Sequence, residues 1–225
     1  MSGQQRTEDR RRTTDNADIP SSVVRFVLMP VLYFIRHGET DFNVAQRLQG
    51  RSETRLNARG RSQASEIVGV LRDLFERDRH QPFDYAFVSS PLLRARETME
   101  LMRAELGLDP KAYAIDDRLA EISYGEWEGL TLKEVQERDP GVLQRREQDK
   151  WDFRPPGGES YREVAERVAA WYATVTRDTV LAAHGGVARA LMANFHILPE
   201  EEATHADILH GVVYVFDRGA LARYS

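Results

Sequence analysis

The sequence predicts a three-layer α/β/α fold, a mainly parallel sheet with helices on both faces. Two observations lead to that prediction. Apolar runs without polar alternation, typical of strands buried on both faces, recur along the chain. Stretches with apolar residues at helical spacing lie between those runs, and strands that alternate with helices build a parallel sheet. With 225 residues, the chain suits one such domain.

The composition excludes several kinds of function. The chain has no cysteine, which rules out disulfides, thiolate nucleophiles and cysteine-bound metals. The net charge of −5 argues against nucleic acid or a membrane surface as a partner, although 31 Lys and Arg allow a local anion pocket. No apolar run reaches membrane-spanning length. We therefore expect a soluble, cytoplasmic protein.

The N-terminal segment differs from the rest of the chain. Residues 1 to about 22 are mostly charged or polar and offer almost nothing apolar to bury. Packing would not offset the entropy lost on ordering such a segment. We therefore predict that residues 1–28 are a disordered or dispensable extension and that residues 29–225 form the domain.

The first strand is predicted at Val31–Ile35, and the charged motif Arg36-His37-Gly38-Glu39-Thr40 follows it directly. Ligands of open α/β sheets bind at the carboxyl ends of strands, because loops and helix N-termini converge there. We expect Gly38 to let a ligand lie close to the main chain beside His37. Residues 41–55 show no periodicity and are expected to form a loop.

A long helix is predicted from about Asn57, with apolar residues at the spacing of one buried face. The second strand is expected at Asp84–Val88. Ser90 is placed to cap the next helix, with Pro91 at its first position, and Gly107 is placed to end it. The buried face of the first helix comprises Ala64, Ile67, Val68, Leu71, Leu74 and Phe75.

The second half of the chain continues the alternation. Ser160 and Glu163 form a capping box that opens a helix. Proline and glycine at 155–158 separate this helix from two shorter helical stretches before it. The remaining elements are predicted as strands at Tyr113–Ile115, Thr179–Ala183 and Val212–Phe216, and as helices at Leu132–Arg138, Val142–Lys150 and Val187–Phe195.

Three strand ends carry charged or small polar residues. They are Arg36-His37-Gly38, Ser89-Ser90-Pro91 leading to Arg94, and His184-Gly185-Gly186. Taken singly, a solvent-exposed Arg94 and an ordinary hydrogen-bonded His184 are the simpler explanations. Together the three ends indicate a phosphoryl pocket, because arginine offers paired donors to phosphate oxygens. A metal site is disfavoured, since no Asp or Glu lies at ligand spacing beside either histidine.

A leaving group also needs a proton donor. The loop Leu119–Gly129 offers Glu121, Glu126 and Glu128, and spacing alone does not choose among them. His205 and His210 lie near an acidic stretch and could form a metal cluster. A solvated turn is the simpler explanation for both.

These motifs, in this order, resemble the histidine phosphatase superfamily in its phosphoglycerate mutase-like branch. The resemblance runs from about Val31 to Phe216 and joins separated motifs, which makes it specific. The motifs are Arg36-His37-Gly38-Glu39-Thr40 with Asn43, Ser89-Ser90-Pro91-Leu92-Leu93-Arg94-Ala95, Glu121 with Tyr124-Gly125-Glu126-Trp127-Glu128-Gly129, and His184-Gly185-Gly186.

The resemblance implies that His37 is the nucleophile and becomes phosphohistidine. It implies that Glu121 is the general acid, which leaves Glu126 and Glu128 as structural or rim residues. It implies neither a metal nor a cofactor, and it makes the last strand the antiparallel edge of a mixed sheet. The resemblance also implies which residues contact the phosphoryl group. Arg36, Asn43 and Arg94 are expected to bind it, and His184 is expected to bind it and to be a catalytic residue.

The family contains both mutases and phosphatases. Glu121 and His184 are 63 positions apart, a shorter interval than the resemblance implies for cofactor-dependent mutases, and a more open pocket admits water. We therefore expect a metal-independent phosphomonoesterase acting on a small phosphorylated metabolite. A cofactor-dependent phosphoglycerate mutase is the alternative, and an idle phospho-ligand or protein-binding domain ranks below it. Substrate and oligomeric state stay open, and specificity is expected in residues 47–55, 131–158 and 199–210.

Overall fold

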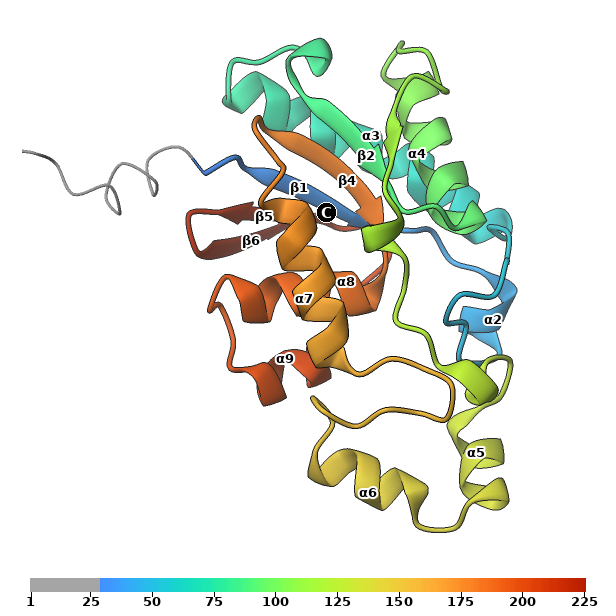
Figure 1. The fold of residues 1–225 in the computed structure, drawn as a ribbon. Coiled ribbons are helices and arrows are strands. Elements are labelled where there is room, and N and C mark those ends of the chain that lie inside the picture. Colours follow the sequence, from blue (N-terminus) through green and yellow to red (C-terminus); the bar gives the residue numbers. More distant parts are fainter. Residues whose placement is uncertain (1–28) are drawn as a thin grey trace, which may run out of the picture.

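The computed structural model describes residues 29–225, so the expectation for residues 1–28 lies outside it. A six-stranded sheet forms the centre, in the order β3-β2-β4-β1-β5-β6, and helices cover both faces (Figure 1). The predicted three-layer α/β/α architecture is confirmed. Within the described residues, no helix is long and apolar enough to cross a membrane.

Parallel pairing brings the polar strand ends together. In the sheet register, Arg36 is opposite Ala183, and Ser89 is opposite Ala182. Because these residues end their strands, the segments that follow all leave the sheet at one edge. The parallel strands are β1 (Leu32–Arg36), β4 (Thr179–Ala183), β2 (Ala86–Ser89) and β3 (Ala114–Ile115), each within two residues of its predicted position.

Two antiparallel strands complete the sheet. β5 (Val213–Asp217) pairs with β1, and β6 (Ala220–Tyr224) pairs with β5. The antiparallel direction of β5 is as expected, but its expected edge position is wrong, because β6 lies outside it. β6 is mostly exposed or half-buried, so it lacks the apolar run by which the other strands were predicted. Arg218 and Gly219 both have positive φ, as the tight hairpin turn between β5 and β6 requires.

The alternation of side chains in β1 separates two cores. Leu32 and Phe34 pack on one face of the sheet, whereas Tyr33 and Ile35 pack on the other. All four are almost completely buried, which explains why the strand sequence is apolar throughout. The first face is covered by α7 (Tyr161–Tyr172) and α8 (Gly185–Asn194), and the second by α3 (Ala58–Arg77) and α4 (Leu93–Glu105).

The helix signals in the sequence are largely confirmed. Asn57 caps α3 by accepting from the Gly60 amide at 2.8 Å, and Ser160 with Glu163 forms the predicted box of α7. Two short helices lie where loops were expected: α2 (Asp41–Val44), which has its own capping box, and α9 (Glu200–His205).

A smaller unit, here called the cap (residues 127–153), holds α5 (Leu132–Arg138) and α6 (Val142–Gln148), close to their predicted positions. Its core is formed by Trp127, Val135 and Val142, and is separate from the two sheet cores. Figure 1 shows α5 and α6 standing apart from the sheet. The cap also contacts the domain through the Arg47–Glu134 ion pair and through His205, which lies near Glu147.

Candidate active site

The polar strand ends form one centre at the edge of the sheet. His37 and His184, which follow β1 and β4, have ring centroids 5.2 Å apart. Arg94 reaches the same place from the first turn of α4, and its Nε lies 3.2 Å from His37 Nε2. These contacts join residues from three strand ends that are up to 147 positions apart in the sequence.

His37 is neutral and presents a lone pair to this centre. Its Nδ1 lies 2.8 Å from the carbonyl oxygen of Gly38, and because a carbonyl only accepts, Nδ1 carries the proton. Nε2 is therefore unprotonated and accepts the hydrogen bond from Arg94 Nε. Burial, together with the positive charges of Arg94 and Arg36, holds the pKa of His37 well below its ordinary value. The imidazole is thus neutral, and its unprotonated nitrogen, Nε2, faces Arg94.

Arg94 is fully buried, so the simpler explanation of an exposed arginine at this helix start is wrong. Its Nη2 donates to the Gly50 carbonyl at 2.7 Å and its Nη1 to the Ser52 carbonyl at 2.9 Å. Burial lowers the pKa of Arg94 to about 10, which leaves it charged at neutral pH. Among the described residues its hydrogen-bond partners include no carboxylate, and its charge is therefore available to an anion.

Ser90 has a different role from the predicted one. α4 begins at Leu93 with Leu92 at the N-cap position, so Ser90 does not cap it. Its Oγ instead lies 2.6 Å from His184 Nε2. The proline that follows was expected inside the helix, but the helix starts two residues later. Sequence motifs do not indicate this contact, because its two partners are 94 positions apart.

Two polar atoms at the centre have no protein partner. Arg36 Nη1 donates to the Ile208 carbonyl at 2.6 Å, but Arg36 Nε is buried without a hydrogen bond among the described residues. His184 Nδ1 is also buried without a hydrogen bond to any described residue. Unpaired buried polar atoms are uncommon and call for an explanation. The several acceptor oxygens of a phosphoryl group would serve both atoms if Ser90 donates to His184 Nε2.

Glu121 lies beside this centre. Its Oε1 accepts from the amides of Ile122 at 2.9 Å and Gly186 at 3.0 Å. Its negative charge also acts on Arg36 and Arg94, for which it opposes the lowering of the pKa by burial. The carboxylate is therefore close to both arginines without a direct ion pair to either.

The other two glutamates of the loop lie elsewhere. Glu128 accepts from the Arg51 amide at 3.0 Å and the Ser52 hydroxyl at 3.1 Å, as well as from groups of its own loop. Glu126 is exposed. Glu128 thus ties the loop after α2 to the loop that carries Glu121.

Asn43 is engaged in a local contact. Its Oδ1 accepts from the Thr40 amide at 3.1 Å, which completes the capping box of α2. No hydrogen bond joins it to the other predicted site residues in the described range. Asn43 thus lies next to the loop that follows His37, and its role in binding phosphate stays a prediction.

The glycines beside the histidines make room for the protein itself. A Cβ on Gly38 would overlap the carbonyl oxygen of Gly60 in α3, so the prediction that a ligand occupies this space is wrong. A Cβ on Gly186 would overlap Oε1 of Glu121. Because they have no Cβ, the two glycines let α3 and the Glu121 side chain pack directly beside the residues of the centre.

Sequence reasoning missed His210. It was interpreted as part of a solvated turn, but its ring centroid lies 5.5 Å from that of His37, and its Nδ1 lies 2.6 Å from the His37 carbonyl oxygen. His205 behaves as expected: it is half-exposed, near Glu147 and Glu201. In residues 29–225, no group of three or more His, Asp and Glu side chains is placed to hold a metal.

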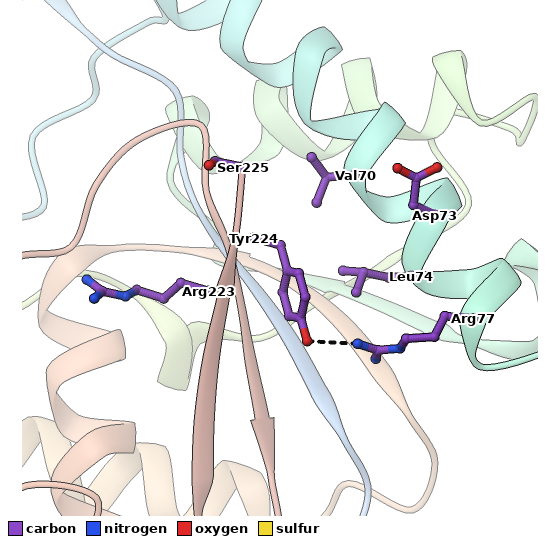
Figure 2. Close-up of a pocket in the computed structure, with 7 residues that line it drawn as sticks. All are labelled: Val70, Asp73, Leu74, Arg77, Arg223, Tyr224 and Ser225. Carbon is purple, nitrogen blue, oxygen red and sulfur yellow. Dashed lines mark hydrogen bonds between the residues drawn. The ribbon is translucent and has the colours of Figure 1, made fainter.

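A separate hollow lies between α3 and β6 (Figure 2). Tyr224 and Arg77 form a 2.8 Å hydrogen bond across it. Leu74 is fourteen residues along α3 from Gly60, which packs beside the centre, and a helix of that length spans roughly 20 Å. The hollow contains none of the predicted site residues. It is lined by Val70, Asp73, Leu74, Arg77, Arg223, Tyr224 and Ser225.

Comparisons with known proteins agree with this geometry. The family model for the histidine phosphatase superfamily (branch 1) matches residues 32–220. A glucosyl-3-phosphoglycerate phosphatase of Mycobacterium tuberculosis is 36% identical over 182 residues, which cover 75% of this chain and 76% of that protein. A 2,3-bisphosphoglycerate-dependent phosphoglycerate mutase of Methylobacterium radiotolerans is 31% identical, over 83% of this chain and 88% of that protein.

Solved structures give the same result. The structure of a mycobacterial glucosyl-3-phosphoglycerate phosphatase in complex with VO3 has a TM-score of 0.68 and 33% sequence identity to this chain. The alignment covers 83% of this chain and 92% of that one. The predicted function is therefore confirmed at its coarse level, as a phosphomonoesterase that acts on a small phosphorylated metabolite. The chain belongs to the histidine phosphatase superfamily, in its branch 1.

Proposed function

We propose that the enzyme hydrolyses its substrate through a phosphohistidine formed on His37. One observation carries this proposal: Nε2 of neutral, buried His37 lies at a centre where, among the described residues, neither Arg36 nor Arg94 is paired with a carboxylate. Arg36, Arg94 and His184 are the proposed phosphate-binding groups. A phosphoryl group is the anion whose geometry matches such donors.

In the first step, the Nε2 lone pair of His37 attacks phosphorus, and the bond to the ester oxygen breaks with its electron pair. Glu121 is protonated in the reacting complex and gives that proton to the departing oxygen, which leaves as an alcohol. The proton of His37 stays on Nδ1, which donates to the Gly38 carbonyl, and this hydrogen bond stabilises the charge that the imidazole acquires. Arg36 and Arg94 stabilise the charge on the equatorial oxygens in the transition state.

In the second step, water attacks phosphorus on the phosphohistidine. Glu121, now a carboxylate, takes a proton from that water. The bond between phosphorus and Nε2 breaks, which returns neutral His37 and releases inorganic phosphate. We propose no metal or cofactor in either step, because the arginines supply the positive charge that Mg²⁺ supplies in kinases.

Positive charge near the cap supports a substrate with a second anionic group. Within residues 29–225, Arg189 donates only to the Ala206 carbonyl at 3.0 Å and the Tyr161 hydroxyl at 3.3 Å. The pKa of Lys150 is lowered by burial and by the positive charges of Arg146 and Arg189, despite the opposing negative charges of Glu147 and Glu201. Lys150 and the two arginines therefore lie close together. A carboxylate would relieve their mutual repulsion.

This cluster adjoins the catalytic centre. A Cβ on Gly185 would lie 3.3 Å from Arg189 Nη1 and 4.0 Å from Arg36 Nε, so the two guanidinium groups are neighbours. A phosphate ester of a glycerate derivative has a carboxylate near its phosphate. The relatives named glucosyl-3-phosphoglycerate phosphatase make that class the first to assay.

Phosphoglycerate mutase is the second candidate, because a mutase is 31% identical to this chain. The deciding experiment measures hydrolysis of p-nitrophenyl phosphate, glycerate phosphates and sugar phosphates, with and without 2,3-bisphosphoglycerate and EDTA. We expect release of inorganic phosphate that neither addition changes substantially, and inhibition by vanadate. Interconversion of 2- and 3-phosphoglycerate that depends on the bisphosphate would establish the mutase instead. A protein that binds phosphate esters without turning them over would be an idle binding domain.

We further propose that residues 29–225 suffice for catalysis, and that the protein is cytoplasmic. Residues 1–28 precede the first strand, and residues 1 to about 22 offer little apolar surface to bury. A variant lacking them should keep its melting temperature within a few degrees and most of its kcat. Insolubility or loss of most of the kcat would contradict this division. Fractionation of the native host checks the location.

A further inference from the structure

One segment contacts the catalytic centre at several points. The carbonyls of Ala206 and Ile208 accept from Arg189 Nε at 3.0 Å and from Arg36 Nη1 at 2.6 Å. His210 Nδ1 lies 2.6 Å from the carbonyl oxygen of His37. Residues 206–210, between α9 and β5, therefore hold the main chain of one predicted catalytic residue and the side chains of two arginines.

The chemistry of this contact fixes the state of His210. A carbonyl oxygen only accepts, so Nδ1 must be the protonated nitrogen and donate. Burial and the positive charge of Arg36 lower the pKa of His210 to about 4, despite the opposing effect of the hydrogen bond. The ring is thus neutral at ordinary pH, and its single N–H group donates to the His37 carbonyl oxygen.

The carbonyl of His37 has no other hydrogen-bond partner in the described part of the chain. Its amide donates to Ala183 of β4 at 2.9 Å, and the amide of Gly38 donates to Thr98 Oγ1 at 3.0 Å. Among the described residues, His210 makes the one hydrogen bond to the carbonyl between them. Loss of the His210 donor would leave the His37 carbonyl oxygen buried without a hydrogen bond. The His37 main chain would then be held only through the amides on either side of that carbonyl.

We propose that His210 is a positioning residue, whose Nδ1–H holds the His37 carbonyl and thereby keeps Nε2 aligned for attack on phosphorus. This inference rests on the proposed role of His37 as nucleophile. His210 itself exchanges no proton in the reaction, because its proton is held by a carbonyl. Small displacements of a reacting atom lower rates steeply, so the contact should affect transfer more than binding.

The test separates the hydrogen bond from the space that the ring fills. His210→Phe keeps a ring without a donor, whereas His210→Asn places an amide donor at the position of Nδ1. We expect kcat/KM for p-nitrophenyl phosphate to fall about tenfold to a hundredfold in His210→Phe and to stay within about threefold of wild type in His210→Asn. Inhibition by inorganic phosphate should be nearly unchanged in both, because Arg36 and Arg94 are intact. His80→Phe, at an exposed histidine, is the matched control.

Melting temperatures are measured for every variant, so that a folding defect is distinguished from a positioning defect. If His210→Phe does not fold, His210→Ala takes its place against the same His210→Asn. Wild-type activity in the donor-free variant overturns the inference, and so does an equal loss in His210→Asn. Activity that survives His37→Ala overturns the proposed function itself, whereas dependence on His37 without dependence on the His210 donor overturns only this inference.

Discussion

The catalytic centre and the cap are built in opposite ways. At the centre, Arg94 is completely buried and held by main-chain carbonyls, and His37 is held through its amide, its carbonyl and its Nδ1. The cap has a core of three buried residues, and ion pairs at its surface. In one of these, Lys133 and Glu137 are 3.9 Å apart with side chains 87% and 64% exposed.

This difference separates chemistry from specificity. Main-chain carbonyls have no rotamers to change. Side chains that donate to them are therefore held in one geometry and are preorganised for the reaction. Exposed ion pairs contribute about 0 to 1 kcal/mol and adapt at little cost. We infer that the centre sets the reaction and that the cap selects the substrate, and four experiments probe that division.

The largest effect is expected at the nucleophile. His37→Ala should lower kcat by roughly four orders of magnitude or more, because no other group presents a lone pair to phosphorus. Rapid quench with labelled substrate should trap an acid-labile, alkali-stable phosphoenzyme in wild type and in His80→Ala, but not in His37→Ala. Label that persists in His37→Ala would place the nucleophile elsewhere.

The next effect depends on the leaving group. Glu121→Gln should lower kcat/KM for an alkyl phosphate by about 10²- to 10⁴-fold, because an alkoxide needs a proton as it departs. The same variant should affect p-nitrophenyl phosphate much less, since p-nitrophenolate leaves without a proton. Glu126→Gln, at an exposed glutamate of the same loop, is the control. An equal fall for both esters would show that Glu121 is not the acid.

The third experiment addresses pH and stability at the centre. Burial and neighbouring positive charge hold the pKa of His37, His184 and His210 below the ordinary value of about 6.5. Below that pH the unfolded chain binds protons that the folded chain does not, so the free energy of unfolding falls as pH drops. From pH 7.5 to 5.5 each histidine should account for about 1 kcal/mol, and the three together for a few kcal/mol.

Urea denaturation at the two pH values checks this expectation. His210→Asn should remove about a third of the fall, because asparagine does not titrate in this range. A free energy of unfolding that stays constant between the two pH values would contradict the neutral state of these rings. If the free energy of unfolding of His210→Asn falls as much as that of wild type, His210 does not contribute to the pH dependence.

The smallest effect is expected in the cap. Lys150→Gln should lower kcat/KM for 3-phosphoglycerate about tenfold and leave p-nitrophenyl phosphate nearly unchanged, since only the former has a carboxylate. Lys133→Gln, on the exposed face of α5, should change neither substrate. Equal effects of Lys150→Gln on both substrates would show that the cap does not distinguish them.

Local patterns in the sequence predicted most of the fold. The uninterrupted apolar run of β4, the apolar spacing of α3 and the capping box of α7 correspond to the observed elements, because each depends on neighbouring residues. β6 was missed because a half-exposed edge strand has no apolar run. Ser90 was assigned a local capping role, but its partner is His184 in another element.

The sequence by itself determined which residue types stand at the strand ends, and the order of those strands indicated that the ends meet. It left open how deeply each group is buried and what it contacts. Only the tertiary structure decided that Arg94 is buried among carbonyls, that Gly38 packs against α3, and that His210 holds His37. The reason is physical: burial and hydrogen bonding between residues far apart in the chain depend on packing, whereas strands and helix caps depend on sequence neighbours.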